Sequence, residues 1–138
     1  MQIKRTATAH WEGSGKDGKE TLSTQSGVLK DSQYGFKSRF EDGIGTNPEE
    51  LIGAAHAGCF SMKLAFNLQA AGITADSIDT TATVILDNGA IPEIQLETKV
   101  KASGLEVEKF NELVADAKAN CPVSKLLNAT ITVNATLA

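Results

Sequence analysis

The chain has 138 residues, of which 41% are hydrophobic and 22% are charged, with a formal net charge of -4. This length allows one domain with a hydrophobic core, and we predict a single domain over residues 1–138. The 13 basic residues are scattered rather than gathered on one face, which argues against nucleic acid as a partner. No signal peptide and no bilayer-length apolar run is found, so we expect a cytoplasmic protein without a membrane partner.

The N-terminal third is predicted to be β-structure. Residues 2–11 and 20–29 have the Thr-rich, β-branched character of exposed or edge strands, and the Gly-rich segment 12–20 is typical of the turn between them. The segment YGFKSRF, residues 34–40, is predicted to form a third short strand.

A helix is predicted to follow from residue 47. Asn47 is a favoured N-cap, Pro48 suits the first helical position, and Glu50 is placed to complete a capping box. Gly72 is a typical stop signal, so this helix runs for about twenty residues.

Two faces of this helix are apolar or small on a 3.6-residue wheel. One holds Ile52, Ala55, Cys59, Met62 and Phe66, and the other holds Ala54, Gly58, Ser61 and Ala65. A helix with two such faces needs cover on two sides, and a sheet supplies one of them. The second cover is either another helix of the same chain or the same helix of a second copy in a homodimer, and periodicity does not decide between them.

The second half of the chain is predicted to be β, helix, β. Residues 77–86, 93–103 and 129–137 alternate apolar and polar side chains, and Asn88-Gly89 marks a tight turn between the first two. A second helix over residues 107–120 carries the apolar face Val107, Phe110, Leu113, Val114 and Ala117. The fold class is therefore α+β, with an antiparallel-rich β-sheet, a long central buried helix and a second helix.

The two cysteines are the candidate reactive groups. Taken alone, Cys59 is best interpreted as a small hydrophobic residue that fills a helix contact. Cys121 directly precedes Pro122, which is suited to open a short helix with Cys121 as its N-cap, where backbone N–H groups favour a thiolate.

The sequence resembles the OsmC/Ohr family of osmotically inducible and organic hydroperoxide resistance proteins, and most of all its OsmC branch. The resemblance rests on AHWEG, STQSGVL, YGFKSRFEDGIGTNPEELIGAAHAGCFSM, SIDTTATVIL and AKANCPVSKLLNATITV, which together cover most of the chain. It implies an OsmC-like α+β fold and an intertwined homodimer with active sites at the subunit interface.

The resemblance also implies a cysteine-based, peroxiredoxin-like peroxidase for oxidative or osmotic stress defence. Such an enzyme reduces organic hydroperoxides, and less efficiently hydrogen peroxide, with no haem, flavin or metal cofactor. Cys59 is then the peroxidatic thiol, and Cys121 resolves its sulfenic acid as a disulfide. Arg39 takes the place of the family's arginine, and Glu49 that of the carboxylate that holds it. A dithiol reductant, of lipoyl type in the hydroperoxide resistance branch, resets the pair.

The chemistry of these residues supports the roles. An apolar helix surface raises a thiol pKa, so an attacking thiolate needs a nearby cation such as Arg39. Ten residues of straight helix separate Glu49 from Cys59 by roughly 15 Å, so the two cannot meet on one helix. Either the helix is broken near Gly53, or Arg39 and Glu49 reach Cys59 of the partner subunit, and we favour the second arrangement.

Several alternatives accompany this interpretation. His56 lies three residues before Cys59, so a Cys-His nucleophile pair is conceivable. A zinc site from His10, His56, Cys59 and Cys121 lacks a recognised ligand spacing. A stress-related module that binds an apolar small molecule, with inert buried thiols, is the main functional alternative. The absence of a Cys-x-x-Cys motif argues against a thiol-disulfide oxidoreductase that acts on proteins.

Overall fold

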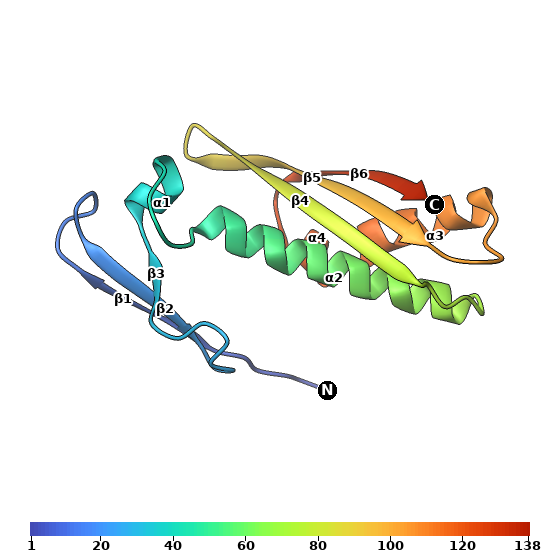
Figure 1. The fold of residues 1–138 in the computed structure, drawn as a ribbon, viewed down its shortest axis with the longest axis horizontal. Helices are drawn as coiled ribbons and strands as arrows, with labels where there is room; N and C mark the ends of the chain where they lie inside the picture. The colour runs from blue at the N-terminus through green and yellow to red at the C-terminus, as the bar shows by residue number, and fades with distance from the viewer. The chain divides into compact units, whose positions relative to one another are not determined.

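The computed structural model describes residues 1–138, which divide into two compact units, Met1–Leu51 and Ile52–Ala138. The N-terminal unit is coloured blue to cyan in Figure 1, and the second unit runs from green to red. Both units combine strands with helices, as the α+β prediction required. None of the helices combines the length and the apolar character needed to cross a membrane.

The N-terminal unit is built on an antiparallel sheet of three strands, in the order β1-β2-β3. The strands are β1 (Ala7–Glu12), β2 (Lys19–Thr24) and β3 (Ser32–Tyr34), and the predicted turn over residues 12–20 connects the first two. The prediction of a strand over residues 34–40 was wrong, because Phe36–Phe40 forms the short helix α1. Its first turn is closed by Ser38, whose hydroxyl accepts a hydrogen bond from the Gly35 N–H and donates one to the Gly35 carbonyl.

Helix α2 (Pro48–Ala70) begins where the sequence predicted. The Asn47 side chain accepts a hydrogen bond from the Glu50 N–H at 2.9 Å, as an N-cap should. The other half of the capping box is absent, since the Glu50 carboxylate accepts its hydrogen bond from the Thr46 hydroxyl instead. The helix continues without a break through Gly53 and is followed by Gly72 at a φ of 78°, a left-handed conformation that favours glycine.

The sheet of the second unit contains β4 (Ser77–Asp87), β5 (Ala90–Lys101) and β6 (Thr130–Leu137), in that order. Strands β4 and β5 are antiparallel, and they meet at Asn88-Gly89, where both residues have a positive φ. Strand β6 pairs with β5 in the parallel direction. This pairing needs a crossover, which α3 (Val107–Asn120) and α4 (Pro122–Leu126) supply.

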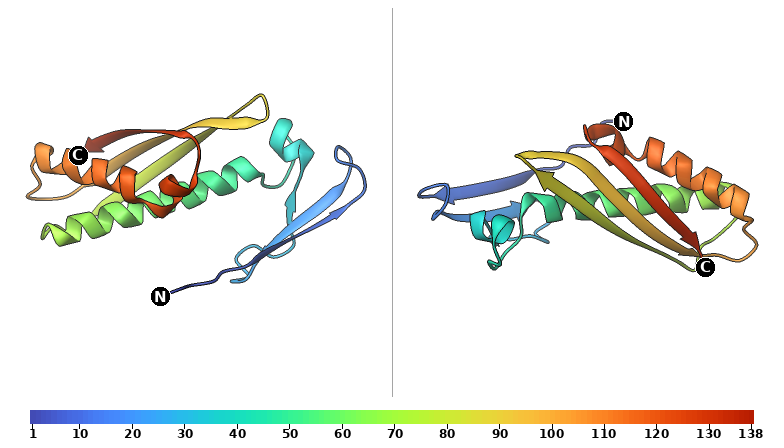
Figure 2. Two further views of the ribbon diagram at one scale, coloured as in Figure 1. Left: turned by 180° about the vertical axis from the view of Figure 1, so that it is seen from behind. Right: turned by 90° about the horizontal axis from the view of Figure 1, so that it is seen from above.

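The core of the second unit lies between one face of this sheet and the helices α2 and α3, which share the same side in both views of Figure 2. Strand β5 turns every second side chain inward, namely Ile94, Leu96, Thr98 and Val100. Helix α3 contributes four of its five predicted apolar residues, while Val107 is 63% exposed.

The face of α2 that enters the core is neither of the two faces identified on the wheel. It consists of Gly53, His56, Phe60, Leu64 and Leu68. Met62 and Phe66, which belong to the first of those two faces, are 63% and 60% exposed. The wheel indicated two faces that need cover, and their residues Ala54, Ala55, Gly58, Met62, Ala65 and Phe66 are exposed in the single chain.

Candidate active site

Cys59 and Cys121 lie in contact in the unit Ile52–Ala138. The S–H of Cys121 donates to the Sγ of Cys59 at a distance of 2.6 Å between the sulfur atoms, and both cysteines are free thiols. Cys59 projects from α2 and is half-buried, whereas Cys121 is fully buried. The two residues are 62 positions apart in the sequence, and the crossover between β5 and β6 brings them together.

The short helix α4 creates this contact. Cys121 is its N-cap, with extended backbone angles, and Pro122 occupies its first turn, as the sequence predicted. The N–H of Cys121 still bonds to the carbonyl of Ala117 at the end of α3. The Cys121 side chain therefore sits at the junction of two helices, facing α2.

The environment of Cys59 favours the neutral thiol. Burial raises its pKa most, the hydrogen bond from Cys121 raises it further, and the backbone N–H of Val123 lowers it. No cation contributes to this balance. Because the thiolate is the reactive form of cysteine, the pair needs a positive group that its own surroundings in this unit do not supply.

His56 does not pair with Cys59. Its Nε2 lies 2.8 Å from the Oγ of Ser124 in α4, and its Nδ1 is buried without a hydrogen-bond partner. Burial lowers the pKa of His56, which keeps the imidazole neutral near pH 7. The sequence did not point to Ser124, and only its spacing of three residues from Cys121 on a short helix indicates a shared neighbourhood.

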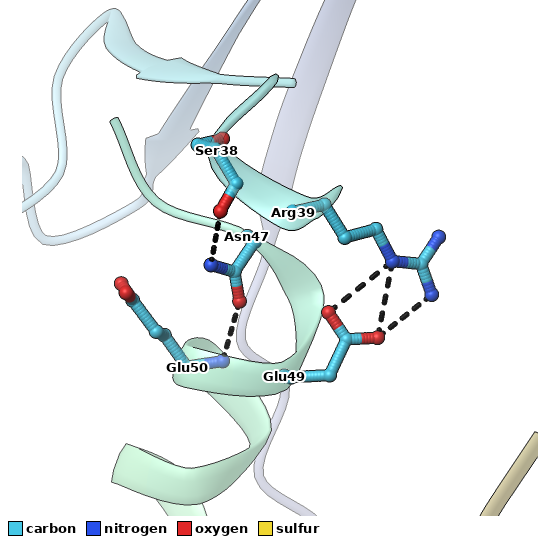
Figure 3. A network of polar contacts seen from close by, with 5 residues as sticks. All are labelled: Ser38, Arg39, Asn47, Glu49 and Glu50. Carbon is cyan, nitrogen blue, oxygen red and sulfur yellow. Dashed lines mark hydrogen bonds and ion pairs between the residues drawn. The ribbon is translucent and has the colours of Figure 1, made fainter. Parts of the chain in front are cut away.

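Arg39 and Glu49 form a bidentate ion pair in the N-terminal unit (Figure 3). The Nη2 of Arg39 donates to Oε1 of Glu49 at 2.7 Å, and Nε donates to both carboxylate oxygens at 3.1 and 3.2 Å. The hydrogen bond from Glu49 raises the pKa of Arg39, which remains a cation. The Nη1 group makes no hydrogen bond and is free to donate to another group.

A second network fixes this ion pair to the fold. The Asn47 amide donates to the carbonyl of Ser38 at 2.9 Å while its oxygen caps α2, so α1 and the first turn of α2 are tied together (Figure 3). The Arg39 guanidinium also lies 5.2 Å from the centroid of the Phe40 ring, within the range of a cation–π contact. The two elements that carry the ion pair, α1 and the first turn of α2, are therefore held in a fixed position relative to each other.

A cavity of about 140 Å³ adjoins Arg39. Its aromatic lining comes from Trp11, Tyr34, Phe36 and Phe40, none of which the sequence had marked as functional. Glu20, which also lines it, is 6% exposed and both of its carboxylate oxygens lack a hydrogen bond. Burial raises the pKa of Glu20, an effect that the nearby N–H of Phe36 partly offsets. Phe60 and Phe110 fill the core of the other unit, and Phe66 is exposed.

The four predicted site residues thus form two pairs, Cys59 with Cys121 and Arg39 with Glu49. The pairs belong to different units, so their joining in one active site stays a prediction. His10 bonds to Glu12 on the surface, and no group of three or more His, Cys, Asp or Glu side chains is arranged to hold a metal ion.

An α+β fold with two free thiols in contact defines a protein built for thiol redox chemistry. The chain belongs to the OsmC-like protein family, whose model matches residues 40–136. It is 52% identical to the peroxiredoxin OsmC of Escherichia coli (strain K12) over 97% of this chain and 96% of that protein. It is 30% identical to the organic hydroperoxide resistance protein OhrB of Bacillus subtilis (strain 168) over 81% of this chain and 84% of that protein.

Solved structures show the same fold. The crystal structure of Bacillus subtilis OhrB aligns with a TM-score of 0.64 at 28% identity, covering 96% of this chain and 98% of that one. An OsmC-like protein of Mycoplasma pneumoniae aligns with a TM-score of 0.75 at 18% identity, covering 100% and 99% of the two chains. The second likeness concerns the fold alone.

Proposed function

We propose that this chain is a cysteine-based peroxidase that reduces organic hydroperoxides, and less efficiently hydrogen peroxide, to alcohols or water in stress defence. The observation that carries the proposal is the 2.6 Å contact between the free thiols of Cys59 and Cys121, in a chain 52% identical to a peroxiredoxin. Names of more distant relatives point to organic hydroperoxides as the substrates.

The proposed chemistry uses the two thiols in sequence. The Cys59 thiolate attacks the terminal oxygen of the hydroperoxide, the O–O bond breaks, and the sulfur becomes a sulfenic acid while an alkoxide leaves and takes up a proton. The Cys121 thiol then attacks the oxidised sulfur. Its proton leaves with the hydroxyl group as water, and a Cys59–Cys121 disulfide remains. We propose a dithiol reductant of lipoyl type, because two thiols of one molecule can complete the exchange that restores both cysteines.

Arg39 is proposed as the cation that the Cys59 thiolate needs. The support is chemical: the surroundings of Cys59 raise its pKa and include no cation, while Glu49 holds Arg39 in a fixed orientation with Nη1 still free. Ten residues of unbroken helix separate Glu49 from Cys59 by about 15 Å. We therefore propose that each ion pair serves Cys59 of the partner subunit.

A homodimer is proposed to bring these groups together, with residues 1–138 as one OsmC-like domain in each subunit. The support is the exposed face of α2, which is apolar or small along its length and includes Ala54, Ala55, Gly58, Met62, Ala65 and Phe66. Exposed apolar surface of this extent on a helix favours association. Small residues at one face allow two such helices to approach closely.

Phe66→Glu is expected to weaken this dimer at least tenfold, because it places a charge where an apolar ring is buried between subunits. Sedimentation velocity over a range of concentrations measures the effect. Val107→Glu is the matched control, since Val107 is 63% exposed and Phe66 60% exposed, but Val107 lies on α3. A wild-type protein that is monomeric and fully active, or equal dimerisation by both variants, would contradict the proposal.

A single-turnover experiment tests the enzymatic function. Reduced protein mixed with one equivalent of cumene hydroperoxide is expected to lose both free thiols and yield one equivalent of cumyl alcohol. The same thiols should react with Ellman's reagent in the native protein. Thiols that react only after denaturation, with the peroxide left intact, would instead favour a module with inert cysteines.

A further inference from the structure

His56 is the one polar side chain in the buried face of α2. The other members of that face are Gly53, Phe60, Leu64 and Leu68, which pack as an apolar core requires. His56 is 0% exposed, and one of its two ring nitrogens has no hydrogen-bond partner. Burying a polar side chain with an unpaired nitrogen lowers stability, so packing does not explain why a histidine occupies this position. The single hydrogen bond of His56, to Ser124, suggests another role.

The short helix α4, which carries Ser124, has few stabilising features within itself. It has five residues, none of which is buried, and its Cys121 N-cap makes no side-chain capping bond. A single helical turn is unstable without tertiary contacts. The bond between Ser124 and His56 is the one hydrogen bond between two side chains that links the body of α4 to α2, beside the backbone N–H of Val123 that points to the Cys59 sulfur.

The position of α4 determines which groups contact the Cys59 sulfur. The N-cap of α4 brings the thiol of Cys121 to 2.6 Å from Cys59, and Val123 directs its backbone N–H to the same sulfur. Cys59 lies one turn along α2 from His56, and Ser124 lies one turn along α4 from Cys121. The hydrogen bond and the thiol contact are therefore neighbouring contacts between the same two helices, one helical turn apart.

We propose that His56 and Ser124 are positioning residues for the resolving step, whose hydrogen bond holds α4 so that Cys121 stays within reach of oxidised Cys59. This inference rests on the proposed function. In the step concerned, the sulfur of Cys121 attacks the sulfenic sulfur of Cys59, the S–O bond breaks, and the hydroxyl leaves as water with the thiol proton. Peroxide attack itself uses the Cys59 thiolate and does not involve Cys121. Loss of the hydrogen bond therefore slows disulfide formation more than peroxide consumption, and lengthens the life of the sulfenic acid.

Ser124→Ala is the test variant, with Ser124→Thr as a conservative variant that keeps the hydroxyl. Reduced protein is mixed with one equivalent of cumene hydroperoxide, and peroxide loss and disulfide formation are followed separately. We expect disulfide formation to slow by about three- to tenfold relative to peroxide loss, the factor that corresponds to one net hydrogen bond. Dimedone should label more Cys59 in Ser124→Ala than in wild type, and Ser124→Thr should restore the wild-type ratio.

Two further variants separate positioning from general destabilisation. His56→Leu combined with Ser124→Ala removes both polar partners, so no unpaired group stays buried, and it should show the same change in ratio. Lys125→Ala, on an exposed neighbour in α4 that makes no hydrogen bond through its side chain, should leave the ratio unchanged. Equal slowing of both steps, or a wild-type ratio in Ser124→Ala, would overturn the proposal.

An experiment with diamide tests the positioning role of His56 and Ser124 separately from the proposed peroxidase function. Diamide oxidises a thiol pair to a disulfide without any peroxide, so it reports how readily the two cysteines combine. If the wild-type protein does not consume hydroperoxide, the peroxidase function fails, and slower diamide oxidation of Ser124→Ala still supports positioning. Equal diamide rates in wild type and Ser124→Ala would overturn positioning whatever the peroxide result.

Discussion

Cys59→Ser is expected to reduce hydroperoxide consumption by at least about three orders of magnitude, as removal of a catalytic nucleophile does in other enzymes. A serine hydroxyl is not ionised near neutral pH, and its oxygen cannot accept the peroxide oxygen to form a sulfenic acid. The loss of cumene hydroperoxide over time, in the presence of excess dithiol, measures the effect. The fold should be kept, because Cys59 is only half-buried and Ser is close to it in size.

The Cys121→Ser variant distinguishes the role of Cys121 from that of Cys59. This variant should still consume one equivalent of hydroperoxide and stop there, with a sulfenic acid on Cys59 that dimedone traps. Mass spectrometry of the labelled protein locates the adduct. An active Cys59→Ser protein, or a Cys121→Ser protein that consumes peroxide with no adduct on Cys59, would assign the chemistry to another residue.

Local signals in the sequence were sufficient for most element boundaries. Asn47 and Pro48 fixed the start of α2, and Asn88-Gly89 fixed the turn between β4 and β5. These signals work because a cap or a tight turn is decided by the backbone needs of a few adjacent residues. Parallel pairing of β5 with β6 was not predicted, since pairing direction depends on the path of the crossover rather than on the strands themselves.

Two features were missed for different reasons. The segment 34–40 was predicted as a strand from its composition, but two hydrogen bonds between the Ser38 hydroxyl and the backbone of Gly35 help to hold residues 36–40 as a helical turn. The buried face of α2 was not recognised on the wheel because apolar or small residues occupy more than one stripe of the helix. Periodicity identifies the core face only when the other faces are polar.

In the candidate site, too, some features were predicted from the sequence and others were not. Motifs indicated Cys59, Cys121, Arg39 and Glu49, and the structure places each within hydrogen-bond distance of one other member of the set. No motif indicated the hydrogen bond between His56 and Ser124, which joins residues 68 positions apart. Nor did the sequence indicate the burial of Glu20, since a Glu in a Thr-rich strand normally faces solvent. Both features depend on which elements pack together.

Arg39→Ala is expected to lower kcat/KM for cumene hydroperoxide at pH 7 by about 10²-fold, the usual effect of removing one group that stabilises developing charge. Burial and Cys121 raise the pKa of the Cys59 thiol, and we propose that Arg39 is the group that lowers it. Without Arg39 the pKa rises, and at any pH below it the thiolate fraction falls tenfold for each unit of the rise. The activity of the variant should therefore increase with pH over a range where the wild type has already levelled off.

The pH profile of Cys59 alkylation by iodoacetamide, recorded without oxygen, measures this pKa directly. Arg39→Lys keeps the charge but loses the planar fork that binds Glu49, so an intermediate profile is expected. Lys37→Ala is the matched control, because it removes an exposed cation from the same helix that makes no ion pair. Since the proposed cation belongs to the partner subunit, mixed dimers of Arg39→Ala with Cys59→Ser should regain half of the sites. An unshifted alkylation profile in Arg39→Ala, with wild-type activity, would leave the thiolate without its proposed source of stabilisation.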